Sequence, residues 1–140
     1  MIPIIKFKKE YYNNIITGKK TQTLRMTSKR LDVQEDQTVK AIFPGTTKEA
    51  LIHITKIGYK QFKSIDQEDA EREGYTTLRE LREDLKKIYP LLEPFDRLYY
   101  YRFEFISEVE QWKLLKKKYP GMSAHVGINT DVQTKQKYKE

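Results

Sequence analysis

The first half of the chain alternates short apolar runs with polar turns, a pattern typical of a small mixed α and β domain. Residues 2–7 (IPIIKF) are apolar, largely β-branched, and predict a first strand. Residues 8–17 carry large side chains at helical spacing and predict a short helix, which Gly18 ends as a C′ glycine. Two further strands are predicted over residues 39–43 (VKAIF) and 50–57 (ALIHITKI).

A polar face runs along another predicted strand, over residues 21–26. The alternation of side chains puts Thr21, Thr23 and Arg25 on one face of this strand and the remaining three residues on the other. This face therefore has the appearance of a functional surface.

Two helices are predicted between residues 64 and 90. Ser64 and Gln67 have the spacing of a capping box, and the helix that they begin ends at Gly74. Thr77 and Glu80 form a second box. It precedes an apolar stripe at helical spacing, which we interpret as core and which consists of Leu78, Leu81, Leu85 and Ile88 before Pro90.

The strongest strand signal covers residues 98–106 (LYYYRFEFI). Its one face carries four aromatic side chains, Tyr99, Tyr101, Phe103 and Phe105. Such a ladder, interleaved with charge, can stack nucleic-acid bases, but it more often forms the wall of a β-barrel core, and we favour the core. Beyond it, Ser107 and Glu110 are expected to begin a helix that Pro120 ends, followed by a lysine-rich polar tail.

The order of these elements is strand, helix, three strands, two helices and a final strand. This order suits an α+β domain, a small and partly open β-barrel with helices on its flanks. With 140 residues, the chain is expected to form one such domain over residues 1–106, with a C-terminal helical extension over residues 107–140.

The net charge of +7 is concentrated at the two ends of the chain. Residues 1–30 hold eight basic side chains against one acidic, whereas residues 31–112 hold 12 against 17 and residues 113–140 hold seven against two. Basic ends around an acidic middle suggest a surface that faces a polyanion, although a lysine-rich soluble surface explains the charge equally well.

Several function classes are excluded by what the sequence lacks. It has no cysteine, which removes thiol catalysis and fits a cytoplasmic protein, and it has neither an apolar run of membrane-spanning length nor a signal peptide. His53 and His125 lie far apart, so no metal site is expected. Phosphate-binding loops, dinucleotide fingerprints and nucleophile elbows are also missing, and no cofactor is expected.

The remaining candidate for chemistry is the stretch GKKTQTLR, residues 18–25. A threonine hydroxyl is a weak nucleophile unless a base takes its proton, and a lysine acts as that base only when its pKa is lowered. Lys20 and Thr23 are such a pair, but strict alternation would place them on opposite faces of a strand. A turn at Gly18 would allow Lys20 to reach Thr23, yet from spacing alone an ordinary basic turn is the better interpretation.

The pattern Gly18-x-Lys20-x-x-Thr23-x-Arg25 resembles the signature of the ASCH domain family, which has a PUA-like fold. Threonine at position 23 is similar to the small N4-acetylcytidine amidohydrolases of that family. Two more segments agree with the resemblance, residues 69–90 with the family's two-helix region and residues 100–105 with its last strand. The resemblance covers about residues 3–106, and it implies a mostly antiparallel PUA-like barrel.

The resemblance implies a hydrolase site made of Lys20, Thr23 and Glu73. In it, Lys20 activates Thr23 or a water, Glu73 protonates the leaving amine or positions the water, and Arg25, with Lys19 and Gly18, binds substrate. Glu73 would lie at a helix C-terminus, where the helix dipole raises the pKa of a carboxyl group. The expected substrate is N4-acetylcytidine or a related acylated nucleobase, free or within RNA.

Two other functions remain open at this point. One is an RNA-binding module without catalysis, which the fold and the basic ends suit equally well. The other is a ribonuclease of the same family, although the chain lacks an obvious histidine pair or carboxylate cluster for it. The combination of Thr23 with Glu73 favours the hydrolase, because a binding module needs cations but neither that hydroxyl nor that acid.

Overall fold

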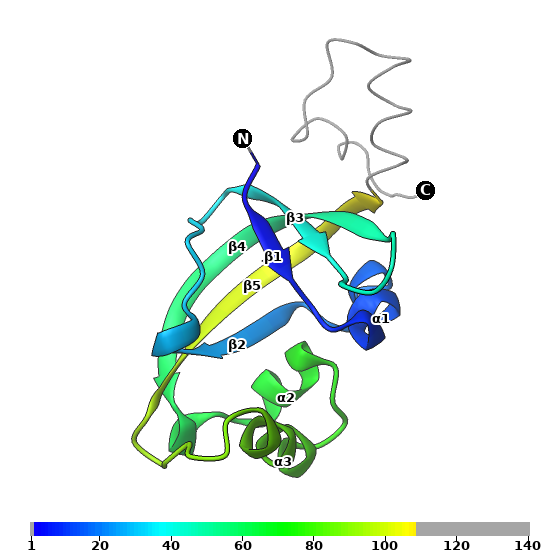
Figure 1. Ribbon diagram of the computed structural model, residues 1–140. Helices are drawn as coiled ribbons and strands as arrows, with labels where there is room; N and C mark the ends of the chain where they lie inside the picture. The colour runs from blue at the N-terminus through cyan, green and yellow to red at the C-terminus, as the bar shows by residue number, and fades with distance from the viewer. Residues whose placement is uncertain (1, 109–140) are drawn as a thin grey trace, which may run out of the picture.

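A computed structural model describes residues 2–108, which form one curved sheet with helices packed against it (Figure 1). The strands are β1 (Ile4–Lys6), β2 (Gln22–Met26), β3 (Thr38–Ile42), β4 (Glu49–Gln61) and β5 (Arg97–Glu108). The helices are α1 (Tyr12–Ile16), α2 (Gln67–Glu73) and α3 (Leu78–Ile88), with short 3-10 turns η1 (Lys9–Tyr11), η2 (Thr27–Lys29) and η3 (Phe62–Ser64). The element order expected from the sequence is therefore confirmed.

The five strands have the spatial order β1-β3-β4-β5-β2, and the sheet is not closed. All neighbouring pairs are antiparallel except β1 and β3, which are parallel. The edge strands β1 and β2 do not pair, but the guanidinium of Arg25 on β2 donates a hydrogen bond to the carbonyl of Lys6 on β1 at 2.9 Å. The barrel is thus partly open, and one side chain bridges its gap.

Two apolar clusters cover the two faces of the sheet. One lies among β1, β3, β4, β5 and α1 and includes Ile5, Ile15, Phe43 and Phe103. The other lies between β2, β5 and the helices α2 and α3; its members include Leu24, Leu81, Leu85, Leu98 and Tyr100. The second cluster fixes α2 and α3 against β2, and this packing positions the end of α2 beside the GKKTQTLR stretch.

The aromatic ladder of β5 is mainly core. Tyr101 and Phe103 are almost fully buried, as expected for a barrel wall, whereas Tyr99 and Phe105 are half-buried. Tyr100, on the opposite face, is buried in the second cluster. The ladder is therefore core in its middle, and both of its ends, Tyr99 and Phe105, are partly exposed.

The capping box expected at Ser64 and Gln67 is wrong. Ser64 belongs to η3, and the N-cap of α2 is Asp66, two residues later. The side chain of Asp66 accepts from the backbone N–H of Asp69, and the side chain of Asp69 accepts from that of Asp66. The reason is that Ile65 is buried and continues the extended chain. The box of Thr77 and Glu80 is confirmed.

Strand β5 extends to residue 108, so Ser107 lies in the sheet opposite Leu51 and does not cap a helix. The remainder of the expected C-terminal extension, including Glu110 and Pro120, lies outside the described residues. Among the helices of the described part of the chain, none is long and apolar enough to cross a membrane.

Candidate functional site

Two turns hold the GKKTQTLR stretch between the ends of α1 and α2. Gly18 has the left-handed φ of 79° that a helix-ending glycine adopts. The backbone N–H of Lys20 then donates to the carbonyl of Asn14 at 2.8 Å, and that of Thr21 donates to the carbonyl of Arg72 at 2.7 Å. Lys20 therefore lies where both helices end, just before β2 begins.

This position resolves the conflict over alternation. Because Lys20 precedes β2 and bonds to α1, its side chain is not bound to the strand's alternating pattern and lies on the same side as that of Thr23. Lys19 and Gly18, which were expected to bind substrate, are exposed and do not line the pocket described below. Neighbouring side chains of an extended segment point in opposite directions, so Lys19 points away when Lys20 is buried.

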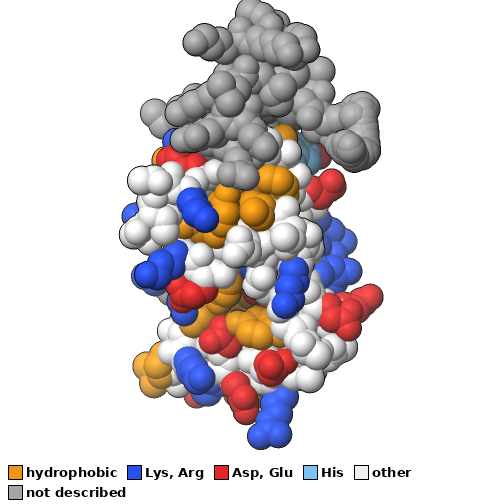
Figure 2. All heavy atoms as spheres, turned by 90° about the vertical axis from the view of Figure 1, so that its right-hand side faces the viewer, with side chains coloured by type: hydrophobic (Ala, Val, Ile, Leu, Met, Phe, Trp, Pro, Cys, Tyr) orange, Lys and Arg blue, Asp and Glu red, His pale blue; other side chains and the backbone are white. Residues whose placement is uncertain are grey.

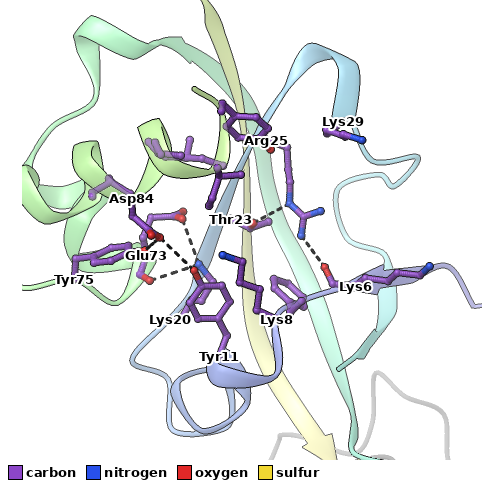
Figure 3. Close-up of a pocket in the computed structure, with 16 residues that line it drawn as sticks. Lys6, Lys8, Tyr11, Lys20, Thr23, Arg25, Lys29, Glu73, Tyr75 and Asp84 are labelled. Atoms are coloured by element: carbon purple, nitrogen blue, oxygen red, sulfur yellow. Dashed lines mark hydrogen bonds and ion pairs between the residues drawn. The ribbon is translucent and has the colours of Figure 1, made fainter. Parts of the chain in front are cut away.

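Lys20 and Glu73 form a buried ion pair (Figure 3). The Lys20 Nζ lies 3.2 Å from Glu73 Oε1, and the two side chains are only 3% and 6% exposed. The ammonium also lies 4.7 Å from the centre of the Tyr11 ring, whose face is partly negative. A pair formed across 53 residues of sequence thus joins the GKKTQTLR stretch to the last residue of α2.

Burial raises the pKa of Glu73, while the charge and the hydrogen bond of Lys20, and the nearby Gln22 amide, lower that pKa in part. Desolvation is the largest of the causes that raise this pKa, in the direction that the position at a helix C-terminus also predicts. Among the described residues, Glu73 Oε2 is buried and forms no hydrogen bond; the amide of nearby Gln22 has two N–H groups and donates one of them to Asp69. One oxygen of this carboxyl group is therefore free to take a proton.

Thr23 is held by Arg25. The Nε of Arg25 donates to Thr23 Oγ1 at 3.1 Å, and the same guanidinium reaches the carbonyl of Lys6. Burial lowers the pKa of Arg25, but the group remains a cation at any physiological pH. Because the Thr23 oxygen accepts this bond, its own proton stays available for donation.

These side chains line a cavity of about 350 Å³ between β2, η1 and α3. The cavity falls within the range of small-molecule ligand pockets, about 300–1,000 Å³. Five basic side chains line it, Lys6, Lys8, Lys20, Arg25 and Lys29, against two acidic ones, Glu73 and Asp84. The site is therefore electropositive, although basic and acidic side chains are interspersed over the face of the molecule shown in Figure 2.

A second polar group in this cavity, which was not predicted from the sequence, consists of Tyr11, Tyr75 and Asp84. Both tyrosine hydroxyls donate to Asp84 Oδ2, that of Tyr11 at 3.4 Å and that of Tyr75 at a shorter distance. Burial raises the pKa of both tyrosines, so both stay neutral donors. Asp84 faces the cavity from α3. In the sequence, it directly precedes Leu85 of the predicted apolar stripe, and this position of an acidic residue beside core residues is the one signal that could have indicated it.

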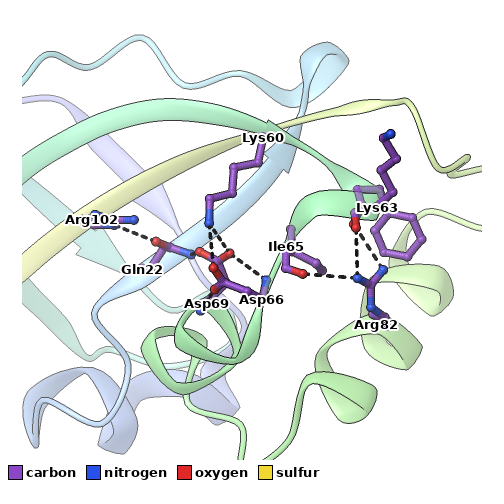
Figure 4. Close-up of polar contacts among 9 residues, drawn as sticks. Gln22, Lys60, Lys63, Ile65, Asp66, Asp69, Arg82 and Arg102 are labelled. Atoms are coloured by element: carbon purple, nitrogen blue, oxygen red, sulfur yellow. Dashed lines mark hydrogen bonds and ion pairs between the residues drawn. The ribbon is translucent and has the colours of Figure 1, made fainter.

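Behind the cavity, a second buried carboxylate is fully bonded (Figure 4). Asp69 accepts from the Gln22 amide at 3.1 Å, from Lys60 at 2.8 Å and from the backbone of Asp66 at 3.0 Å. Arg102 in turn donates to the Gln22 carbonyl oxygen at 3.0 Å. This network ties α2 to β2, β4 and β5 and so holds Glu73 in place.

A metal centre has no support in residues 2–108, where no three of the usual oxygen, nitrogen or sulfur ligands gather. His53 lies in β4, with its Nε2 3.5 Å from Asp36 Oδ1, as a residue of the sheet. The chemistry available in the cavity is that of an ammonium, a guanidinium, a hydroxyl and a carboxyl group.

Comparison with known proteins identifies the fold. No family model matches the sequence, and no curated protein matches it. The ASCH domain from Lactobacillus crispatus JV V101 superposes with a TM-score of 0.65 at 16% identity, covering 76% of this chain and 80% of that one. A protein from Enterococcus faecalis V583 gives 0.64 at 17% identity over 81% and 82%. ASCH from Zymomonas mobilis gives 0.53 at 14% over 86% and 80%. As the resemblance of the motif implied, the chain has the α+β fold of the ASCH domains.

Proposed function

We propose that the protein is an amidohydrolase that removes the acetyl group from N4-acetylcytidine or a related acylated nucleobase. The observation that carries this proposal is the buried Lys20–Glu73 pair, with one carboxyl oxygen unbonded, in the same cavity as Thr23. A structural ion pair would be expected to have both oxygens satisfied, because a buried acceptor without a partner costs free energy. Perturbed carboxyl groups in a cavity of ligand size are typical of active sites.

The reaction breaks the bond between the acyl carbon and N4 and consumes one water. The nucleophile, Thr23 Oγ or a water held by it, forms a bond to the acyl carbon and gives its proton to Glu73 Oε2. Glu73 then delivers this proton to N4, so that cytidine leaves with its amino group restored and acetate is the second product. If Thr23 itself is the nucleophile, water releases the acetate in a second step.

The pairing favours Glu73, rather than Lys20, as the proton acceptor, because the Lys20 ammonium is already bonded to Oε1. The charge of Lys20 lowers the pKa of Glu73 and so favours the carboxylate form, against the larger, opposite effect of burial. Arg25 orients Thr23 and, with Lys20, supplies positive charge for the oxyanion that develops on the acyl carbonyl.

The test is turnover of N4-acetylcytidine by the purified protein, followed as release of cytidine. We expect turnover in the wild type and at least a hundredfold loss in Lys20→Met and Thr23→Val. Lys87→Met, which removes an exposed lysine of α3 outside the cavity, is the matched control and should keep full activity. Absence of turnover, or turnover untouched by both cavity variants, would refute the proposal.

A second candidate function is RNA binding without catalysis, and the excess of basic side chains in and around the cavity favours it. Lys6, Lys8 and Lys29 are exposed at the cavity and available to phosphates. In that case, affinity for RNA should fall steeply with salt while the acylated nucleoside is left intact. Salt-independent or undetectable binding would exclude it.

A further inference from the structure

Two arginines and two tyrosines form a row at the end of the sheet where β4 ends and β5 begins. The guanidinium of Arg30 lies 4.5 Å from the centre of the Tyr99 ring. The rings of Tyr99 and Tyr59 are 5.8 Å apart with an angle of 53° between them. Arg97 covers Tyr59 at 4.4 Å. We call these four residues the Arg/Tyr row.

The Arg/Tyr row is open to solvent and carries free positive charge. Tyr59 is 55% exposed, and both arginines are exposed. Within residues 2–108, no carboxylate forms an ion pair with Arg30 or Arg97. The row therefore contributes little to the core, and the guanidinium donors remain available to an anion.

The row continues the cavity along the same face of the sheet. Arg25, which lines the cavity, lies opposite Tyr99, and Tyr99 lies opposite Tyr59. Residues directly opposite in antiparallel strands share a face, and neighbouring strands are about 4.8 Å apart, so Tyr59 lies about 10 Å from Arg25. Lys29 of the cavity also precedes Arg30 directly.

We propose that the Arg/Tyr row binds nucleotides that flank the acylated base, so that the substrate is an acetylated cytidine within single-stranded RNA. This inference rests on the proposed function for the acylated nucleotide in the cavity, and on the Arg/Tyr row for the nucleotides beside it. Tyrosine rings and guanidinium planes are the groups on which unpaired bases stack, and guanidinium N–H groups bind phosphates. Stacked nucleotides about 3.4 Å apart would place about three of them over 10 Å.

Direct binding tests the row without any catalysis. The probe is an unmodified, fluorescently labelled single-stranded RNA of about ten nucleotides, within the usual range of site sizes, and the readout is fluorescence anisotropy. Tyr59→Ala should weaken binding about tenfold, and Tyr59→Phe should not, because stacking needs the ring and not the hydroxyl. Arg97→Gln should weaken binding and reduce the salt slope by about 1.

Leu91→Ala is the matched control, because Leu91 is 89% exposed but does not belong to the row. It should bind RNA like the wild type. Equal affinity of wild type, Tyr59→Ala and Arg97→Gln, or no RNA binding at all, would overturn the inference.

Kinetics separates this inference from the proposed function. On an RNA carrying one central N4-acetylcytidine, Tyr59→Ala should raise KM about tenfold, while its kcat/KM for the free nucleoside should stay unchanged. If the protein hydrolyses both substrates and Tyr59→Ala has no effect, the role of the Arg/Tyr row in binding RNA is refuted and the hydrolase proposal stands. Row-dependent RNA binding without hydrolysis of either substrate would refute the hydrolase and retain the row as an RNA-binding surface.

Discussion

The helix α2 buries two carboxyl groups one turn apart, and their surroundings differ in one respect. Asp69 is fully buried, and its two oxygens together accept three hydrogen bonds. Glu73 is nearly as buried, but only Oε1 is bonded and Oε2 has no partner among the described residues. Asp69 faces the interior behind β2, whereas Glu73 faces the cavity.

This difference separates a structural acid from a reactive one. A carboxylate whose oxygens are all satisfied holds elements together, and any change to it costs stability. A buried carboxyl group with an unbonded oxygen and a raised pKa has lost its hydration without a replacement hydrogen bond. A substrate in the adjacent cavity, or a proton, can supply the missing interaction. Four predictions test this contrast and the cavity around Glu73.

The largest effect is expected on activity. Glu73→Gln should lower kcat on N4-acetylcytidine by roughly 10²–10⁴-fold, because the amide cannot take up the proton, while Asp69→Asn should leave the kcat of its folded fraction within a few-fold of the wild type. Glu71→Gln, on the exposed side of α2, is the control and should be fully active. Full activity in Glu73→Gln would show that Glu73 does not transfer a proton in the reaction.

The free energy of unfolding should depend more on Asp69 than on Glu73, the reverse of the order expected for activity. Asp69→Asn should lower the free energy of unfolding by roughly 1–3 kcal/mol, because it takes the charged acceptor away from the buried Gln22 amide and from the half-buried Lys60 ammonium. Asp66→Asn should change it little, since asparagine also caps a helix. Urea unfolding followed by circular dichroism measures both. A stable Asp69→Asn would contradict the structural role.

A tenfold effect on kcat is expected from Arg25→Lys. Arginine bonds to Thr23 and to the Lys6 carbonyl with two different nitrogens, and a lysine ammonium does not reproduce this planar fork. The loss should also lower the free energy of unfolding by about 1 kcal/mol, the usual worth of one hydrogen bond. An unchanged kcat would mean that Thr23 needs no orientation by Arg25.

The smallest effect is a shift along the pH axis. Burial raises the pKa of Glu73 and Lys20 lowers it, so the carbon-13 signal of the Glu73 carboxyl should titrate above the usual glutamate range. Lys20→Met should move this titration to still higher pH, because the opposing charge is gone. Between the ordinary and the raised pKa the folded state binds more protons than the unfolded state, so stability falls as pH rises through that window. A titration at the ordinary glutamate pKa would contradict the burial argument.

The order of the elements could be predicted from the sequence, because the signals for each helix and strand lie within a few neighbouring residues. The box of Thr77 and Glu80, the alternation of residues 98–106 and the glycines at 18 and 74 all depend on neighbours within a few residues. The start of α2 was predicted wrongly for the same reason. Ser64 and Asp66 both have suitable side chains, and only the burial of Ile65 against the helices decides between them.

The residues of the candidate site also differ in how far local sequence could identify them. Lys20 and Thr23 were chosen from an eight-residue motif and a family resemblance, and Glu73 from a second segment. The sequence alone does not distinguish Lys19 from Lys20, because the backbone hydrogen bonds to Asn14 and Arg72 decide which of the two adjacent lysines is buried.

By itself, then, the sequence determined the elements, their order and the residues that bring chemistry to the chain. The tertiary structure alone decided which of these residues meet, that Glu73 keeps one oxygen free while Asp69 keeps none, and that Tyr11, Tyr75 and Asp84 join the same cavity. The physical reason is that local patterns depend on bonds within one or two turns. Desolvation and hydrogen-bond satisfaction depend on groups that are 47 and 53 residues apart in the chain, as for Gln22 with Asp69 and Lys20 with Glu73.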